Sequence, residues 1–434
     1  MAKTWQPLKG TKVLSFELAF ALPAATRSLY DLGADVVRVS PPARQVDTYL
    51  GHIDGVFQGK SSMSIDLTKS AGQELAQRLA GKADVVCNNF RPGVLEKYGL
   101  GASALRATNP ALIALQVSGY GTPGPWSKFP AFGPSTEAAG GLNRLLVDEG
   151  EVPVRVGSAV FSDQLAGRYS VLAVLAALVE RNKSGTGATL DLSMTACITH
   201  MLGQPMTQAY LQGKTPAASK NRDPRFVPQG VYRCASNAEV TDEWIAISVA
   251  NDKQWRSLAE LLNANELVAL GGRTLAASAS VAKRSAMHAR IDAALREFCA
   301  RFDKDSLAER LQTLGVPAAP VRTTQDQALD PNVLARGSLA LLKHKEPVLG
   351  YAAHPHAPLP WRVVGRSRRA LSNYRPTGAD NKRVLMRWLN MHSAEIRQLT
   401  SSGVLALAPP QELRPRRRLK HHDAAHATKL GLPQ

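Results

Sequence analysis

The alternation of β-branched runs with helical stretches over the first 120 residues is the feature that most restricts the fold. Runs rich in Val, Ile and Leu are separated by stretches with helical periodicity, such as SAGQELAQRLAG. Strands that alternate with helices predict βαβ units and a mostly parallel sheet, hence an α/β fold. The strand-like runs are TKVLSF, ADVVRVS, SMSIDL, ADVVCNN and LIALQVSGYG.

The turn after the first strand-like run reads ELAFALPAAT and contains no GxGxxG. That glycine pattern brings a dinucleotide pyrophosphate to a helix N-terminus in NAD and FAD enzymes. The large domain is therefore predicted to be Rossmann-like but to lack the usual dinucleotide-binding turn.

The length of the chain predicts more than one domain, because 434 residues are too many for one compact core. A stretch rich in Pro, Gly, Lys and Arg at 213–230 predicts a boundary. Beyond it, strand-like and amphipathic runs predict a smaller α/β domain. The expected division is 1–222 for the N-terminal part of the large domain, 223–329 for the small domain, 330–400 for a return segment that completes the large domain, and 401–434 for a disordered basic tail.

The net charge of +18 has two interpretations, nucleic-acid binding or attraction of an anionic small molecule. The segment 412–434 contributes only +4, so most of the charge is spread over the body of the chain. No helix-turn-helix, RNP-type or zinc-finger signature accompanies it. The charge therefore favours a polyphosphate ligand, and no nucleic-acid partner is expected.

The four cysteines, Cys87, Cys197, Cys234 and Cys299, are widely scattered and form no CxxC pair. This spacing argues against a disulfide framework or a zinc site and favours a reducing compartment. The longest uncharged apolar run, YSVLAVLAALV, is far shorter than the roughly 20 residues that span a bilayer. A soluble, cytoplasmic protein without a membrane partner is expected.

The segment VGSAVFSDQLAGRYS carries the most pointed local feature, an acidic residue before an Ala-rich apolar helix. A short loop is predicted to end at Asp163, with the helix starting in QLAGRYS. Asp163 could be an ordinary N-cap, since Asp is a favoured capping residue. It could also be a covalent nucleophile, held ionised by the helix start. Composition alone does not choose between the two.

A series of blocks, in fixed order over residues 9–395, resembles the class III CoA-transferases. This is the carnitine-dehydratase and bile-acid-inducible family, which includes formyl-CoA transferase. The blocks are GADVVRVSPP, GKSSMSIDL, ADVVCNNFRPGVLEKYGLG, NPALIALQVSGYGTPGPW, GSAVFSDQLAG, RNKSGTGATLDLSM, PQGVYRCA, EWIAISV, LGVPAAPV and DPNVLARG.

The resemblance implies a function for particular residues. Asp163 matches the aspartate that attacks the acyl-CoA thioester, forming an anhydride and then an aspartyl-CoA thioester. It also implies CoA and acyl-CoA as substrates, no tightly bound cofactor, no metal, and an interlocked homodimer. The large domain would bind CoA. The positions that match the family's CoA contacts are Arg38, Asn89, Phe90, Arg91, Lys97 and Tyr98.

Two substitutions relative to family members bear on the substrate pocket. Phe20 stands where formyl-CoA transferase has a glutamine, which favours an acid larger or more apolar than oxalate. Phe132 and Gly133 stand where the related acyl-CoA racemases have the histidine and aspartate of a Gly-His-Asp motif. Phenylalanine cannot transfer a proton, which counts against racemisation. His200 is another histidine that could replace the missing one.

Two alternatives to a CoA-transferase therefore stay open. The first is an acyl-CoA racemase or epimerase of the same superfamily. The second is a non-catalytic subunit of a hetero-oligomeric CoA-transferase, since some relatives work as two unlike subunits.

Overall fold

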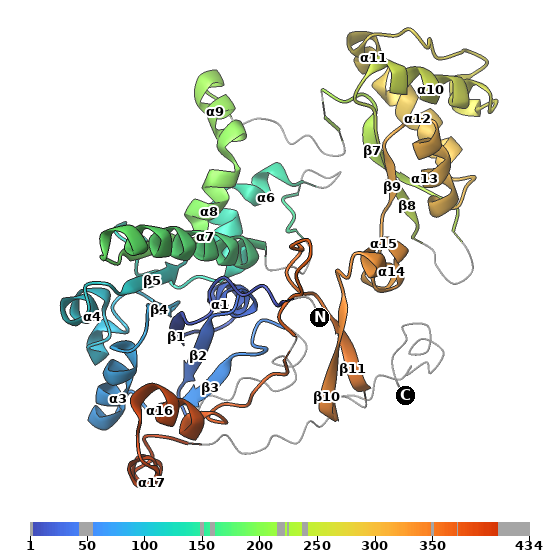
Figure 1. Cartoon of the computed structure of the whole chain (residues 1–434). Helices are drawn as coiled ribbons and strands as arrows, with labels where there is room; N and C mark the ends of the chain where they lie inside the picture. The colour runs from blue at the N-terminus through green and yellow to red at the C-terminus, as the bar shows by residue number, and fades with distance from the viewer. Residues whose placement is uncertain are drawn as a thin grey trace. The chain divides into compact units, whose positions relative to one another are not determined.

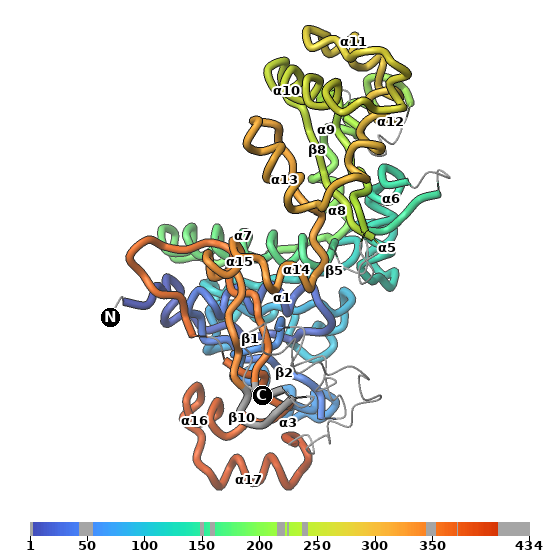
Figure 2. Tube along the Cα trace, turned by 90° about the vertical axis from the view of Figure 1, so that its right-hand side faces the viewer, coloured from blue at the N-terminus to red at the C-terminus, as the bar shows by residue number. Residues whose placement is uncertain are grey.

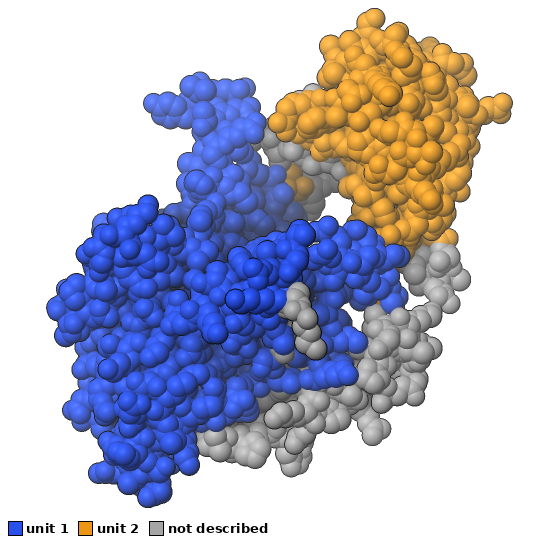
Figure 3. Space-filling model, in the orientation of Figure 1, with its two compact units in different colours: residues 1–146, 153–216, 328–434 blue, residues 147–152, 217–327 orange. Residues whose placement is uncertain are grey.

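The structure is a computed structural model, and its chain splits into two compact units (Figures 1 and 3). Unit 1 comprises residues 1–146, 153–216 and 328–434, and unit 2 comprises 147–152 and 217–327. The structure describes residues 3–42, 55–147, 152–156, 161–214, 222–223, 225–236, 242–348, 351–370 and 372–406.

A parallel sheet forms the centre of unit 1. Within the described residues its strand order is β3-β2-β1-β4-β5-β6, the order of the Rossmann fold. The predicted α/β, Rossmann-like fold is therefore confirmed. The first five strands match the predicted runs, whereas β6 was not among them. The strands are β1 (Lys12–Phe16), β2 (Asp35–Ser40), β3 (Ser61–Ser64), β4 (Val85–Asn88), β5 (Ile113–Ser118) and β6 (Thr189–Ser193).

Helices cover both faces of this sheet (Figures 1 and 2). On one face α1 (Ala21–Asp31), α7 (Phe161–Ser184) and α8 (Met194–Met201) pack on β1, β4 and β5 through buried apolar side chains. On the other face lie α3 (Ser70–Ala80), α4 (Ala102–Thr108), α16 (Asn381–Leu389) and α17 (Ser393–Ser401). Burial on both sides explains why β1, β2, β4 and β5 appear in the sequence as mostly apolar runs.

Shorter helices complete unit 1. They are η1 (Glu96–Tyr98), α5 (Gly133–Ala139), α6 (Leu142–Leu145), α9 (Gly203–Gln212) and α15 (Pro331–Ala335). A further helix, α14 (Thr324–Leu329), crosses the boundary between the units. An antiparallel hairpin, β10 (Ala340–Val348) and β11 (Tyr351–His356), precedes the final helices.

Unit 2 has its own sheet and core. Within its described residues β7 (Gln229–Arg233), β8 (Trp244–Ser248) and β9 (Ala318–Pro320) pair antiparallel in that order. Helices pack on the sheet through a separate apolar cluster that includes the fully buried Trp255 and Phe298. They are α10 (Asp252–Asn263), η2 (Val268–Leu270), α12 (His288–Cys299) and α13 (Lys304–Thr313). A short helix, α11 (Val281–Ala286), precedes α12 and contributes no residue to this cluster.

The segment that returns to unit 1 is anchored at the edge strand β3. The backbone N–H of Ser62 donates to Asp380 Oδ2 at 3.0 Å, and Ser62 O accepts from the Asp380 N–H at 3.0 Å. Arg375 and Arg383 also donate to the Asp380 carboxylate, which is buried. The Asp380 carboxylate thus receives several donors where the return segment meets the sheet, and the neighbouring Asn381 Oδ1 accepts from the Ser64 N–H at 2.9 Å. Most of the predicted tail, residues 407–434, lies outside the described residues.

None of the helices among the described residues is both long enough and apolar enough to cross a membrane.

We expect Asp380→Asn to lower the free energy of unfolding by about 2 kcal/mol at pH 7, because charge-assisted hydrogen bonds to a buried group are lost. Burial acts to raise the pKa of Asp380, but hydrogen bonds from Arg375, Ser62 and Arg383 outweigh it and hold the pKa below its usual value. The stabilisation is therefore complete above pH ~4 and is lost as the pH falls through the folded-state pKa.

Urea unfolding of the full chain between pH 3 and 7 measures this difference. Glu74→Gln, on the exposed side of α3, is the matched control and should unfold like the wild type. Equal stability of Asp380→Asn and Glu74→Gln at pH 7 would contradict the anchoring role.

Candidate active site

The carboxyl ends of β1 and β4 meet where the strand order reverses. In open α/β sheets ligands bind in the crevice at this switch point. Here the two loops are joined by Asn89, whose Oδ1 accepts from the Leu18 N–H at 2.8 Å and whose Nδ2 donates to Leu18 O at 2.6 Å. The Asn89 side chain thus sets the spacing of the two loops that border the crevice.

The other predicted CoA-binding residues after β4 follow in the next ten positions. Phe90 and Tyr98 are partly buried against the sheet's core, whereas Arg91 and Lys97 are exposed. The Phe90 carbonyl accepts from Gln116 Nε2 at 3.0 Å, which ties this loop to β5. The arrangement leaves two cations at the surface beside the carboxyl end of β4.

Arg38 lies on β2, the strand that flanks β1 on the side away from β4. Arg38 is only 1% exposed. Its Nη2 donates to Ser62 Oγ at 2.8 Å, and its guanidinium lies over the rings of Phe57 and Tyr374, at 5.0 and 5.5 Å from their centroids. Nη1 is buried and has no hydrogen-bond partner among the described residues. Arg38 is therefore a buried cation.

Beside the loop after β4 lies a cavity of about 150 Å³. Its polar lining includes Asn88 at the end of β4, Gln116 within β5, Asp191 within β6, and Glu96. Most of the predicted CoA-contact residues are close in sequence to residues that line this cavity, but none of them lines it.

Asp163 lies in the first turn of α7, which begins at Phe161. The sequence predicted a loop that ends at Asp163 and a helix that starts at Gln164, so the observed helix starts three residues earlier. A contact from another helix holds this first turn, because the Ser162 N–H donates to Glu137 Oε1 of α5 at 3.3 Å. The preceding loop residues 157–160 lie outside the described residues.

The Asp163 carboxylate is positioned by α1 as well as by its own helix. The backbone N–H of Ala21, the first residue of α1, donates to it. Phe20, at the N-cap of α1, makes no side-chain capping bond, so a carboxylate from α7 occupies the usual place of a cap. Asp163 therefore caps a different helix from the one that the sequence predicted.

Burial raises the pKa of Asp163 to about 6, the Ala21 hydrogen bond opposes the rise, and the charge of Glu137 adds to it. A carboxyl group with such a pKa is mostly ionised at pH 7 and is more basic than an ordinary aspartate. Strongly shifted pKa values of this kind are common at catalytic positions. The environment thus favours a chemical role for Asp163.

Helix α5 packs closely against the Asp163 carboxylate on the side away from α1. A Cβ at Gly133 would lie 2.3 Å from Asp163 Oδ2, so any larger residue there would collide with it. Ser162 Oγ lies 3.0 Å from Gly133 O and 2.9 Å from Thr136 Oγ1, and these hydrogen bonds join α5 to α7. The aspartate that racemases carry at this position does not fit beside Asp163 in this arrangement.

Glu137 is the main site residue that the sequence analysis missed. Its side chain is fully buried, accepts from the Ser162 N–H, and lies 3.7 Å from Arg155 Nε, a distance that makes an ion pair without a hydrogen bond. The only available signal was a charged residue in the otherwise small and polar GPSTEAAGG, which does not reveal burial.

The two predicted pocket residues each precede a residue that touches Asp163. Phe20 comes directly before Ala21 and packs against Val56, Phe57 and Tyr374. Phe132 comes directly before Gly133 and is 74% exposed. His200, on α8, makes an edge-to-face contact with the Tyr169 ring at 5.5 Å. That contact provides no link between His200 and Asp163.

Comparison with known proteins identifies the family to which this site belongs. Residues 8–381 match CoA-transferase family III. The chain belongs to that family. It is an enzyme, a CoA-transferase, as the sequence predicted.

Three relatives illustrate the likeness to family III. The succinyl-CoA–D-citramalate CoA-transferase of Chloroflexus aurantiacus is 30% identical, over 77% of this chain and 83% of that protein. The α subunit of the succinyl-CoA–L-malate CoA-transferase of the same organism is 28% identical over 92% of each chain. A CAIB/BAIF family protein from Brucella suis superposes with a TM-score of 0.73 at 28% identity, over 88% of this chain and 99% of that one.

We expect Glu137→Gln to lower the pKa of Asp163 by up to about one unit, because it removes a negative charge that disfavours the ionised form. ¹³C NMR of protein labelled at aspartate carboxyl carbons measures the titration, with Asp163→Asn identifying the signal. Glu180→Gln, exposed on the same helix α7, is the control and should leave the titration unchanged. An unchanged Asp163 pKa in Glu137→Gln would contradict the electrostatic coupling.

Proposed function

We propose that this family III enzyme moves CoA from an acyl-CoA donor to a carboxylic acid acceptor, with Asp163 as the nucleophile. The observation that carries the proposal is the Asp163 carboxylate, buried beside the switch point with its pKa raised to about 6. Its hydrogen bond from the start of α1 gives it a fixed orientation.

In the first half of the reaction an Asp163 oxygen attacks the donor thioester carbonyl. The carbon–sulfur bond breaks, CoA leaves as a thiolate, and a mixed acyl–aspartyl anhydride remains. The thiolate then attacks the aspartyl carbonyl, which releases the donor acid and leaves an aspartyl-CoA thioester. Covalent catalysis of this kind divides one difficult exchange into easier steps.

In the second half the acceptor carboxylate attacks the aspartyl-CoA thioester and again displaces CoA thiolate. The thiolate attacks the acceptor's acyl carbonyl in the new anhydride, so that acceptor-CoA leaves and the Asp163 carboxylate is restored. Every step exchanges one acyl bond for another, and no electrons are gained or lost overall.

The chain contributes a donor to the charge that develops in these steps. Attack on the aspartyl carbonyl places an oxyanion on the Asp163 side chain. The Ala21 N–H already donates to that group and would stabilise the oxyanion. The raised pKa of Asp163 also makes its carboxylate a better nucleophile than an ordinary aspartate while leaving it mostly ionised at pH 7.

We propose that CoA occupies the switch-point crevice. Arg91 and Lys97 are exposed cations beside the carboxyl end of β4 and suit the phosphates. Phe90 and Tyr98 offer partly buried aromatic surface next to them. Asn89 borders the crevice as the bridge to Leu18, whereas Arg38 is a buried cation on β2, one strand away from it. CoA is thus a substrate, and no tightly bound cofactor is proposed.

Two alternatives, a racemase and a subunit that needs an unlike partner, can be distinguished from the proposed transferase. A racemase would need a second proton-transfer group beside Asp163, and Phe132 and Gly133 supply none. Because one relative is named as the α subunit of a two-subunit enzyme, this chain could need an unlike partner. Transfer activity of the purified single chain separates that case from the one proposed.

We expect Asp163→Asn to abolish transfer and to stabilise the fold. Asn keeps an acceptor for the Ala21 N–H but cannot form the anhydride. Because the folded-state pKa is raised, the ionised carboxylate destabilises the fold at pH 7, by up to about 3 kcal/mol for a shift of two units. The gain should therefore be present at pH 7 and absent below pH ~4.

Two measurements test this prediction: chemical trapping of the intermediates on Asp163, and unfolding of the Asp163→Asn variant. Wild-type protein incubated with succinyl-CoA and then hydroxylamine should carry a hydroxamate on the peptide containing FSDQLAG. Borohydride should reduce the aspartyl-CoA thioester to an alcohol at the same residue. Substantial transfer by Asp163→Asn would refute the nucleophile. Exchange of the α-proton with deuterated water, without any adduct, would instead favour the racemase.

We further propose that the enzyme is a homodimer. Helix α9 buries none of its residues in the described structure, and Tyr210 and Leu211 are 89% and 76% exposed. On α7, Leu172 and Val179 are also exposed, at 61% and 57%. Exposed apolar side chains grouped on two helices are typical of an interface. The family resemblance implies that the partner is a second, interlocked copy.

An interlocked dimer cannot separate without unfolding, so dilution should not dissociate it. Light scattering of the native protein from micromolar to nanomolar concentration should give the mass of a dimer throughout. The double variant Tyr210→Ser with Leu211→Ser should reduce the yield of refolded dimer. Glu180→Gln is the control and should not reduce it. A monomer at any native concentration would contradict interlocking.

A further inference from the structure

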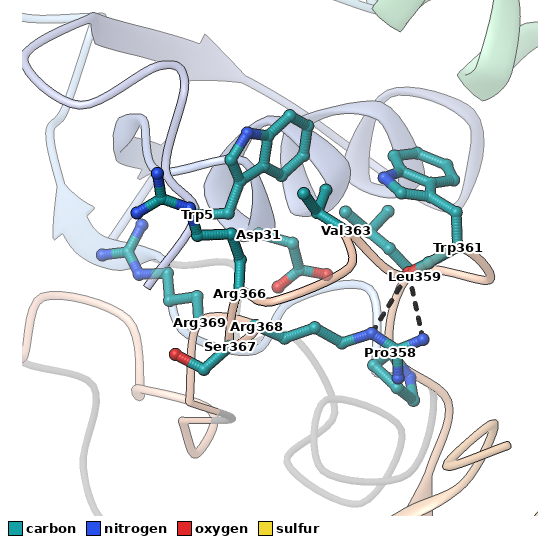
Figure 4. A pocket seen from close by; sticks show the side chains of 10 residues that line it. All are labelled: Trp5, Asp31, Pro358, Leu359, Trp361, Val363, Arg366, Ser367, Arg368 and Arg369. Atoms are coloured by element: carbon teal, nitrogen blue, oxygen red, sulfur yellow. Dashed lines mark hydrogen bonds between the residues drawn. The ribbon is translucent and has the colours of Figure 1, made fainter. Parts of the chain in front are cut away.

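A cavity of about 180 Å³ lies between α1, α7 and the residues that follow β11. Its polar lining comes from Arg27 and Ser28 on α1, Gln164 and Arg168 on α7, and His356. Asp31 and Leu359 also line the neighbouring pocket, which lies between Trp5 and Trp361 (Figure 4). All of these residues belong to unit 1.

The charge of Arg27 is already balanced inside the wall of this cavity. Its Nε donates to both carboxylate oxygens of Asp31, at 2.9 and 3.0 Å, and its Nη1 donates to Gly55 O at 2.7 Å. The Arg27 side chain is almost fully buried. Arg27 and Asp31 therefore form a neutral, rigid part of the wall.

Arg168 differs from Arg27 because it is exposed and forms no ion pair among the described residues. Its two hydrogen bonds, from Nη1 to Ser28 Oγ and from Nη2 to Gln164 Oε1, are both long at 3.4 Å. These neutral acceptors leave its charge uncompensated. Arg168 can therefore reorient toward a stronger acceptor such as a carboxylate.

His356 adds no positive or negative charge to the cavity. Burial, Arg27 and His354 lower the pKa of His356 to about 3, so the ring is neutral at physiological pH. Arg27 Nη1 lies 3.0 Å from His356 Nε2, and because a guanidinium only donates, Nε2 accepts and Nδ1 carries the proton. Among the described residues that line the cavity, the charges thus sum to the single positive charge of Arg168.

Asp163 does not itself line the cavity, but residues close to it on α7 and close to its partner Ala21 on α1 do. Gln164 directly follows Asp163, and Ala24, in the cavity wall, is one turn along α1 from Ala21. Arg168 is five residues beyond Asp163, a rise of about 7.5 Å along the helix. Ala24 and Val56 also pack against Phe20, which joins this wall to the predicted substrate pocket. Ala24, which contacts Phe20 and lines the cavity, thus links the surroundings of Asp163 to those of Arg168.

From this arrangement we propose that the cavity is an anion subsite that binds the distal carboxylate of a dicarboxylic acid or dicarboxylic acyl-CoA through Arg168. This inference rests on the proposed function of Asp163. Arg168 forms a charge-assisted hydrogen bond to the distal carboxylate. The subsite selects four- or five-carbon dicarboxylic acids over the matching monocarboxylic acids.

Succinyl-CoA and butyryl-CoA form a matched pair of probes, because they differ only in a terminal carboxylate or methyl group. The rate of hydroxamate formation at Asp163 is compared in wild type, Arg168→Met, Arg168→Lys and Lys183→Met. Lys183 is exposed on α7, outside the cavity, and gives the control for loss of one charge. Arg168→Met should slow the succinyl reaction about tenfold or more and leave the butyryl reaction within twofold.

Arg168→Lys, which keeps the charge, should recover part of the succinyl rate, and Lys183→Met should react like wild type. Equal slowing with both thioesters would mean that Arg168 binds a phosphate of CoA, which overturns the subsite. An unchanged succinyl rate in Arg168→Met would overturn it as well.

Calorimetry with free succinate and butyrate tests the subsite without any turnover. Wild-type protein should bind succinate more tightly than butyrate, and Arg168→Met should lose this preference. No preference in the wild type would overturn the subsite. If no thioester labels Asp163 while Arg168→Met still loses succinate binding, the proposed nucleophile fails and the subsite stands.

Discussion

The contact between α1 and α7 is the interaction on which the rest of the site depends. The two helices approach closely at Gly167, where a Cβ would lie 2.9 Å from Ala21 O and 3.1 Å from the Ala24 Cβ. This approach places the first N–H of α1 against the Asp163 carboxylate. Further along the two helices, the same contact brings Ser28 of α1 to Arg168 of α7. One helix pair therefore positions both the proposed nucleophile and the cation of the proposed subsite.

Burial of charge at the carboxyl edge of the sheet is costly, and the structure offsets the cost in two different ways. Glu17 is fully paired: it accepts from Ser15, Thr26 and the buried Lys60. Burial lowers the pKa of Lys60 to about 8, and Glu17 opposes this shift. Asp163 has no cation among its pKa determinants, and Glu137 lies nearby. The first cluster stabilises the loop after β1, whereas the second keeps a carboxylate reactive at the expense of stability.

The fold was largely predictable from local sequence. The strands β1, β2, β4 and β5 are buried on both faces, so each appears as a short, mostly apolar run rich in β-branched residues. β3 is also buried, but its residues Ser61–Ser64 are mostly serine. β6 was missed because TLDLS is short, partly exposed and mixes polar with apolar residues. The first turn of α7 was missed for another reason. Its start depends on Glu137, which accepts the Ser162 N–H from a separate helix.

The sequence by itself determined the α/β class, the strand positions and, through ordered motifs, the family and the position of Asp163. These features depend on periodicity and on residues near one another in the chain. Only the tertiary structure decided what surrounds Asp163: the Ala21 N–H, the close backbone of Gly133, and the buried Glu137. It also showed that Arg38 is buried beside aromatic rings. Burial and pKa depend on groups that distant segments bring together, and no local pattern records those distances.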